Sequence, residues 1–333
     1  MIIFLTIFFL AILILGHEFG HFIVAKMLKI KVEEFGIGFP PRLFARKFRE
    51  TEYSLNLLPF GGFVRIYGED ALNTKEVKDK KRSFYYQSFI KKALVISAGV
   101  IINILIAWIA FSVVLSVGMP GGIFINDVVE GSPAYLAGFE AGEFIEGFES
   151  ADEFLSYIDA HLGEEIVIND KAVTPRIDTP EGEGPLGIGI LPSGIDPTPF
   201  PQNIWLGLKT ALRTLGLIFI ALGSMLFGAL SGNFEALSQV SGPVGVFNIV
   251  KDAGQLGSIY FVQLVGIISL NLAALNTIPF PALDGGRLLF IALQKIFGDK
   301  ILNKRTEIII NVAGFLFLIA LMIAVTIKDI ISL

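Results

Sequence analysis

The sequence predicts a polytopic α-helical membrane protein with about four transmembrane helices, a membrane-associated β-hairpin region on the cytosolic side and a separate extracytosolic domain. Of its 333 residues, 53% are hydrophobic and 35 are glycine, and the mean hydropathy is +0.69. A helix crosses the hydrocarbon layer with about 20 apolar residues, and several stretches of the chain reach that length. The charges between these stretches are unevenly distributed, which separates two kinds of loop.

Residues 1–28 form the first predicted transmembrane helix. The run from Ile2 to Ala25 is almost uncharged. It lacks the basic start and the small-residue cleavage site of a signal peptide, so we expect it to be retained. Lys26, Lys29 and Lys31 follow directly. Because basic residues favour the cytosolic side, we expect the N-terminus to lie outside.

Charge distinguishes the two long connecting regions. Residues 28–93 contain 14 Lys or Arg and 8 Asp or Glu, whereas residues 119–204 contain 2 and 16. The first region is therefore predicted to be cytosolic and the second extracytosolic, with residues 93–118 as the second transmembrane helix between them. The chain has no cysteine, which excludes disulfides, thiolate metal sites and cysteine nucleophiles.

The basic region, residues 29–92, is predicted to form β-hairpins followed by a helix. Apolar residues alternate at positions 53, 55 and 57, between glycines at 36, 38, 61 and 62. This pattern is typical of short strands with glycine turns. Residues 75–92 combine basic and aromatic side chains, which favours an interfacial helix. Contact with anionic lipid headgroups is enough to explain those basic residues.

The acidic region, residues 119–196, is predicted to be a β-rich domain. Its Gly131-Ser132-Pro133-Ala134 segment resembles the start of a PDZ domain, whose glycine-containing loop offers backbone N–H groups to a chain terminus or strand. We therefore expect a PDZ-like domain that can take an extracytosolic ligand. A generic β-rich domain with a Gly/Pro turn is the alternative. Prolines at 192, 197, 199 and 201 mark its end.

His17-Glu18-Phe19-Gly20-His21 lies within the first apolar run. Residues i and i+4 share one face of a helix, so both imidazoles can reach one Zn²⁺. The carboxylate of Glu18 can then contact the water that the ion binds. A chance match with two hydrogen-bonded histidines is the alternative. Two histidines and a carboxylate are costly in hydrocarbon, and a coordinated metal would offset that cost.

Asp284 is the candidate for a third metal ligand. The remaining histidine, His161, lies in the extracytosolic region, beyond reach of a site near the cytosolic face. Besides Glu18, only Asp284 is a carboxylate well inside an apolar segment. Two prolines break the helix before it and two glycines loosen its restart, so Asp284 lies on irregular backbone, which a membrane tolerates only inside protein or along a wet cavity. We expect a broken third transmembrane helix over residues 258–298.

Counting the crossings gives four spans. Residues 306–328 form the last predicted helix, which leads out from a basic cytosolic segment. Since Asp284 must meet the histidines near the cytosolic face, residues 258–298 must enter from outside. Residues 197–257 must then begin and end outside, although 205–232 are long and apolar enough to span. We expect 205–232 to lie at the outer interface or to dip in and return.

These motifs resemble those of the site-2 proteases, the intramembrane zinc metalloproteases, and most of all their bacterial PDZ-containing regulator-of-sigma branch. The HExxH motif of the family falls on residues 17–21, and its NxxPxPxLDG motif falls on residues 276–285. The resemblance implies a Zn²⁺ cofactor, catalytic and cleft-lining side chains, and substrate contact by the membrane-associated β-structure. The implied roles are Glu18 as catalytic base, His17, His21 and Asp284 as zinc ligands, and Asn276, Gly36 and Gly38 as substrate-binding residues.

The resemblance also implies an activity, which is cleavage of a transmembrane segment of single-pass membrane proteins such as anti-sigma factors or signal-peptide remnants. The expected location is the bacterial cytoplasmic membrane, with lipid and membrane substrates as partners and no nucleic acid. The PDZ-like domain would admit substrates that another protease has already shortened. Two departures are that Val100 follows Gly99 where the family often has proline, and that the acidic region has room for one PDZ domain where relatives of this branch can have two.

Two alternatives are not enzymes. A membrane PDZ scaffold with a retained structural zinc would normally close the site with a fourth protein ligand, and no candidate remains in the sequence. A transporter would be expected to show internal repeats with paired broken helices, and the sequence has one such break, at 276–286.

Overall fold

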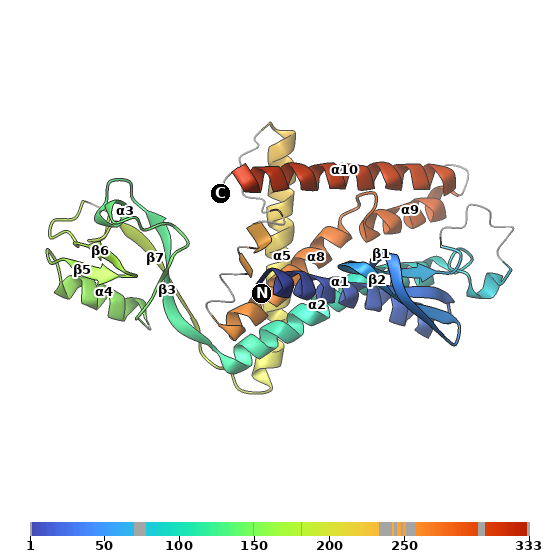
Figure 1. Cartoon of the computed structure of the whole chain (residues 1–333), viewed down its shortest axis with the longest axis horizontal. Helices are drawn as coiled ribbons and strands as arrows, with labels where there is room; N and C mark the ends of the chain where they lie inside the picture. Colours follow the sequence, from blue (N-terminus) through green and yellow to red (C-terminus); the bar gives the residue numbers. More distant parts are fainter. Residues whose placement is uncertain are drawn as a thin grey trace. The chain divides into compact units, whose positions relative to one another are not determined.

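The computed structural model describes residues 2–69, 78–148, 150–180, 182–232, 242, 245–247, 249–250, 257–298 and 304–331. The chain divides into two compact units (Figure 1). Met1–Ser112 and Ile204–Leu333 together form one, which we call the helical unit. Val113–Asn203 form the other, which we call the β-rich unit and which covers the predicted extracytosolic domain.

Long apolar helices make up most of the helical unit. Five helices of the described chain are long and apolar enough to cross a membrane. They are α1 (Ile2–Met27), α2 (Phe89–Val117), α5 (Gln202–Leu230), α8 (Ser258–Thr277) and α10 (Lys304–Ile331). A shorter helix, α9 (Asp284–Phe297), follows α8 after a break that contains the two prolines. The break lies where the sequence predicted it.

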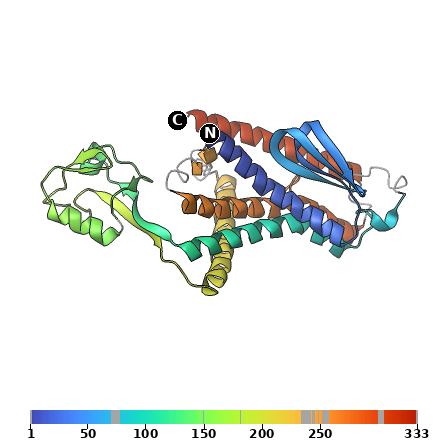
Figure 2. The same ribbon diagram turned by 60° about the horizontal axis from the view of Figure 1, so that its bottom comes forward.

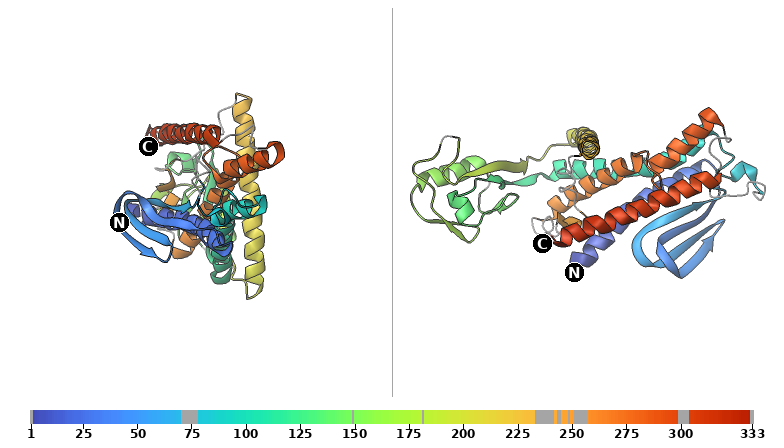
Figure 3. Two further views of the ribbon diagram at one scale, coloured as in Figure 1. Left: turned by 90° about the vertical axis from the view of Figure 1, so that its right-hand side faces the viewer. Right: turned by 90° about the horizontal axis from the view of Figure 1, so that it is seen from above.

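Four of the long helices lie lengthwise beside one another. α1 and the α8–α9 pair run in one direction, whereas α2 and α10 run in the opposite direction (Figures 2 and 3). The chain therefore leaves α2 and enters α8 at the same end of this bundle. The side of the membrane on which residues 197–257 begin and end stays a prediction.

α5 runs across the other helices instead of along them (Figures 1 and 3). It packs by its first half, where Ala211 is buried with Phe111 of α2 and Leu270 of α8. The helix is continuous over 29 residues. A continuous helix has no turn at which the chain could return, so the re-entrant form expected for residues 205–232 is not seen within α5. Its placement at the outer interface stays a prediction.

The hairpin region forms one small sheet. Strands β1 (Val32–Phe48) and β2 (Thr51–Ile66) bend and pair as four short segments. Residues 32–37 pair with 62–66 on one side and with 52–55 on the other. In this register residues 62–66 form an edge of the sheet.

That edge lies beside α1. A Cβ built at Gly61 would be 3.1 Å from the side chain of Ile14, and one at Gly62 would be 2.7 Å from Leu15. Ile14 and Leu15 directly precede the HExxH turn of the same helix. The sheet therefore reaches the level of the candidate site along α1.

Residues 78–92 do not form the interfacial helix predicted for 75–92, and for this described part the prediction is wrong. A single short 3-10 helix, η2 (Lys80–Arg82), precedes α2, which begins at Phe89. Lys31 N donates to Arg82 O and Phe84 N donates to Tyr67 O. These bonds join the segment to the hairpin instead of to a helical ladder. Residues 75–77 lie outside the described residues.

An ion pair connects the turn between β1 and β2 to α1. Glu50 accepts hydrogen bonds from Arg82 Nη2 and from Lys26 Nζ, the latter at 2.8 Å. The Arg82 bond, followed by the Lys26 bond, lowers the pKa of Glu50 from 4.5 to about 2. Since the folded-state pKa is lowered, the stabilisation is complete above pH 4.5 and is lost as the pH falls to about 2.

The β-rich unit has a core of its own. Its larger sheet has the order β4 (Phe144–Ile145), β3 (Met119–Val128) and β7 (Ile188–Ile195). A separate pair joins β5 (Ile166–Ile168) and β6 (Lys171–Val173), and the helices are α3 (Pro133–Leu136) and α4 (Ala151–Ala160). Phe154 and Ile158 of α4 are buried with Ile123 and Ile125 of β3. The unit is β-rich as expected, and its likeness to a PDZ domain stays a prediction.

Candidate metal centre

His17 and His21 lie one turn apart on α1, and their rings approach each other. Their Nε2 atoms are 3.1 Å apart and their ring centroids 4.8 Å apart. Both residues are buried, with 6% and 8% of their surface exposed. The helical period places them on one face, as the motif spacing predicted.

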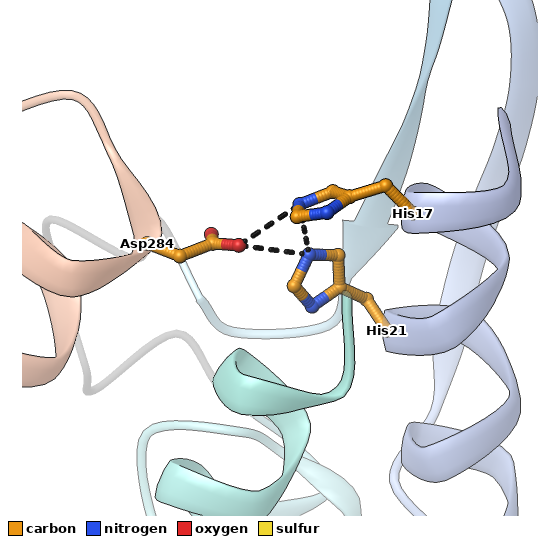
Figure 4. A group of neighbouring side chains, drawn as sticks. All are labelled: His17, His21 and Asp284. Carbon is orange, nitrogen blue, oxygen red and sulfur yellow. Dashed lines mark hydrogen bonds and ion pairs between the residues drawn. The ribbon is translucent and has the colours of Figure 1, made fainter. Parts of the chain in front are cut away.

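Asp284 reaches the two histidines from the first turn of α9 (Figure 4). Its Oδ2 lies 3.0 Å from His17 Nε2 and 3.2 Å from His21 Nε2. Within the described ranges, these three residues are the one group of His, Cys, Asp or Glu that could hold a metal ion. His161 lies in the β-rich unit, where its Nδ1 is 2.8 Å from Tyr157 O. The three candidate ligands come together although His17 and Asp284 are 267 residues apart in the chain.

The three ligand atoms are spaced as one small ion requires. Ligand atoms about 2.0–2.1 Å from a tetrahedral Zn²⁺ are about 3.3 Å from one another. The observed separations are 3.0, 3.1 and 3.2 Å. One zinc ion therefore fits between these residues.

The other ring nitrogens are held by α2. His21 Nδ1 lies 2.8 Å from Val95 O. His17 Nδ1 lies 3.3 Å from Asn103 Nδ2, while Asn103 Oδ1 is buried with no hydrogen-bond partner. Amide oxygen and nitrogen are assigned from their partners, and a turned amide would let Oδ1 accept the proton of His17 Nδ1. Both imidazoles would then present an unprotonated Nε2, which is the form that binds a metal.

Gly99 of α2 has no side chain, and this leaves space for the two histidine rings. A Cβ at this position would lie 2.6 Å from His17 Nε2 and 2.6 Å from His21 Nε2. Gly20 of α1 similarly allows close approach, because a Cβ there would lie 2.5 Å from Ala98 O. The two helices therefore pack closely through Gly20 and Gly99, next to the candidate ligands.

The turn before Asp284 is closed by two further glycines. A Cβ at Gly285 would lie 2.3 Å from Thr277 O, and one at Gly286 would lie 2.1 Å from Phe280 O. The expectation that these glycines loosen the restart of the helix is wrong. They permit the backbone of the break to fold tightly against the first turn of α9.

A cavity of about 590 Å³ lies beside the candidate ligands, within the size range of small-molecule sites. Glu18 and Asn276 line it together with His17 and Asp284. Most of the remaining wall is apolar and comes from five elements of the helical unit. Its larger apolar side chains belong to Ile14, Phe39, Phe63, Leu272, Ile308, Val312 and Phe315.

Gly36 and Gly38 are not among the lining residues. Gly36 pairs with both Phe63 and Ser54 in the sheet, and a Cβ there would lie 2.3 Å from the Phe63 ring. Gly38 accepts a 3.1 Å hydrogen bond from Asn56 Nδ2. The absence of a side chain at Gly36 leaves space for the ring of Phe63, which does line the cavity. Direct substrate contact by the two glycines stays a prediction.

Three polar residues near the site were not among those singled out from the sequence. Arg287 lines the cavity, and its Nη1 donates to Glu69 Oε1 at 2.9 Å. Asn103 and Asn311 also line it. Both asparagines lie inside stretches predicted to span the membrane, where polar side chains are rare and need partners. That rarity is the signal that could have identified them.

Substitution of Gly99 tests the packing beneath the histidines. We expect Gly99→Ala to weaken zinc binding about 10- to 100-fold, the usual effect of disturbing groups that support metal ligands. Competition with a chelator measures the affinity. The control is Gly216→Ala, because a Cβ at Gly216 meets no atom within 4 Å. Equal zinc affinity of Gly99→Ala and wild type would contradict the described contact.

Comparison with known proteins places this chain in a family. The model of peptidase family M50 matches residues 5–321. A Clostridium perfringens protein named as a candidate zinc metalloprotease is 36% identical, covering 96% of this chain and 95% of the relative. The zinc metalloprotease RasP of Shouchella clausii is 28% identical over 98% and 97% of the two chains. The membrane metalloprotease ARASP of Arabidopsis thaliana chloroplasts is 29% identical over 97% and 77%.

The family match covers both motifs of the site and nearly the whole chain. The chain therefore belongs to peptidase family M50, the site-2 protease family of zinc-dependent membrane metalloproteases.

Proposed function

We propose that this metalloprotease cleaves a transmembrane segment of single-pass membrane proteins, as in regulated intramembrane proteolysis. The observation that carries the proposal is the convergence of His17, His21 and Asp284 beside a cavity with mainly apolar walls. The residues around the cavity belong to four helices of membrane-spanning length, to the hairpin sheet, and to α9 with the break before it. An apolar peptide segment fits such walls. Anti-sigma factors and signal-peptide remnants are candidate substrates of this kind.

In this proposal His17, His21 and Asp284 hold the zinc ion. Zinc, when bound, acts as a Lewis acid that makes water a nucleophile at neutral pH. Glu18 takes the proton of the attacking water and passes it to the nitrogen of the leaving amine. Asn276, on the cavity wall, donates a hydrogen bond to the carbonyl oxygen that becomes negative.

The hairpin sheet offers a way to hold the substrate in extended form. A membrane helix keeps each carbonyl in its own hydrogen-bond ladder, so the bond to be cut must first be unwound. Residues 62–66 form a sheet edge, and Gly62 and Phe63 of this edge line the cavity. An unwound segment that pairs with this edge would have partners for its backbone beside Glu18.

Two substitutions test the roles of Glu18 and Asp284. We expect Glu18→Gln to keep about one zinc per chain but to lose cleavage of a single-pass substrate, because the ligands remain and the base is lost. Asp284→Asn is expected to weaken zinc binding, since a charged ligand is removed. Zinc content, chelator competition and a cleavage assay in liposomes measure these effects.

Matched controls are the exposed Glu165→Gln and Asp159→Asn, which should change neither property. Full cleavage by Glu18→Gln would refute its role as base. Unchanged zinc affinity in Asp284→Asn would mean that the third ligand is another group.

For the membrane topology we propose four spans, formed by α1, α2, α8 with α9, and α10, with the N-terminus outside and α5 at the outer interface. This is supported by the crosswise direction of α5 and by the common end at which α2 finishes and α8 starts (Figure 3). Lys209 and Arg213 of α5 are exposed, which suits contact with headgroups. We place the protein in the bacterial cytoplasmic membrane.

Cysteine labelling tests this topology on a chain that has no cysteine of its own. Ser231→Cys, at the end of α5, is expected to react with an impermeant thiol reagent added outside. Lys81→Cys serves as the control and should react only after permeabilisation. Reaction of Ser231→Cys from the cytosolic side alone would mean that α5 crosses the membrane, and the four-span topology would be abandoned.

We propose that the β-rich unit selects substrates and takes no part in the chemistry. Its support is that, in the part of the chain that the structure describes, every residue lining the cavity belongs to the helical unit. Deleting residues 122–196 is therefore expected to preserve zinc binding and cleavage and to admit substrates with bulky extracytosolic domains. If the deleted protein binds zinc but still rejects a bulky substrate that wild type rejects, the selection role is wrong.

A further inference from the structure

The middle of α10 contacts the break before Asp284. Of the residues from 305 to 331 of this helix, only Gly314 is buried. A Cβ at Gly314 would lie 2.6 Å from Pro281 Cβ and 2.7 Å from Pro281 O. Phe317 packs on Phe280 with ring centroids 5.7 Å apart. The helix is therefore docked on the irregular segment that leads into α9.

At this contact the side chain of Asn311 accepts a hydrogen bond from Ala282, a residue with an unusual backbone conformation. Ala282 has a φ of +76°, in the left-handed region that residues other than glycine rarely adopt. Its N–H donates to Asn311 Oδ1 at 3.0 Å, across 29 residues of chain. Asp284 follows two residues later as the first residue of α9. The conformation of Ala282 thus determines the direction in which the chain presents Asp284.

The hydrogen bond has few substitutes at this depth. Backbone groups outside a regular helix need a partner within the protein when water is scarce. Leu283 N is satisfied locally by Phe280 O at 3.2 Å, whereas Ala282 N takes its partner from another helix. Loss of the Asn311 oxygen would remove the protein acceptor of that N–H, and the turn would no longer be held in its present shape by α10.

We propose that Asn311 is a positioning residue of the metal centre. Through Ala282 it keeps Asp284 Oδ2 at 3.0–3.2 Å from the two imidazoles, so that α10 completes the metal site without supplying a ligand. This inference rests on the proposed role of Asp284 as a zinc ligand. It is distinct from a substrate contact by Asn311, which would leave zinc affinity unchanged.

The test compares zinc affinities of full-length variants by chelator competition, with thermal unfolding of the zinc-free protein as a check of folding. Asn311→Ala is expected to bind zinc about 10- to 100-fold more weakly than wild type. Asn311→Asp keeps an acceptor oxygen and should restore most of the affinity. Asn271→Ala is the matched control, because the Asn271 amide donates to Ile267 O of its own helix and is exposed.

A spectroscopic reading separates a change in the site from general loss of stability. With Co²⁺ in place of Zn²⁺, the visible spectrum of Asn311→Ala should shift from that of wild type because the spectrum follows ligand geometry. The spectra of Asn311→Asp and Asn271→Ala should match wild type. Gly314→Ala, which displaces Pro281 without touching Asn311, should also weaken zinc binding, and it serves as the test if Asn311→Ala does not fold.

The inference would be overturned if Asn311→Ala had the zinc affinity and spectrum of wild type, or if Asn311→Asp and Asn311→Ala were weakened equally. If Asn311→Ala does not fold, wild-type zinc affinity in Gly314→Ala would overturn it. Asp284→Asn, measured alongside, separates failure of the ligand assignment of Asp284 from failure of the positioning role of Asn311. If Asp284→Asn binds zinc as wild type does, the ligand assignment itself has failed. If Asp284→Asn is weakened while Asn311→Ala is not, only the positioning role has failed.

Discussion

Polar and charged side chains within a hydrocarbon layer must find partners inside the protein, and this constraint shapes the whole helical unit. His17, His21 and Asp284 meet each other at 3.0–3.2 Å. Their meeting needs two helices from opposite ends of the sequence and a third helix, α2, that supplies Val95 O and Asn103 to the outer nitrogens of the imidazoles. A metal ion between them would satisfy the remaining lone pairs.

The same constraint explains where irregular backbone occurs. The break between α8 and α9 folds on itself through Gly285 and Gly286 and is covered by α10. The hairpin sheet beside α1 pairs its own segments, and its edge faces the cavity. Among the described residues, both of these non-helical segments adjoin the metal centre, because Ala282, Gly62 and Phe63 line the cavity with the candidate ligands. Irregular structure here serves to expose backbone or to aim a ligand.

Local patterns predicted the motif helix and the candidate ligands, whereas the other contacts between distant segments could not be predicted from the sequence. The spacing of His17 and His21 depends only on the helical period, and Asp284 could be found because few carboxylates lie in apolar stretches. The helix expected over 75–92 is absent from its described part because residues 82–84 pair with Lys31 and Tyr67, which no local pattern reveals. The roles of Gly99 and Asn311 likewise depend on what other helices place against them.

X-ray absorption at the zinc edge of the loaded protein counts the atoms around the ion and so tests whether His17, His21 and Asp284 are its ligands. The chain has three histidines and no cysteine. We expect two imidazole nitrogens and at least one carboxylate oxygen at about 2.0–2.2 Å, with no sulfur. Asp284→Asn should change the oxygen contribution while both imidazoles remain. Three imidazoles, which would require His161, or fewer than two would contradict a site built by α1 and α9.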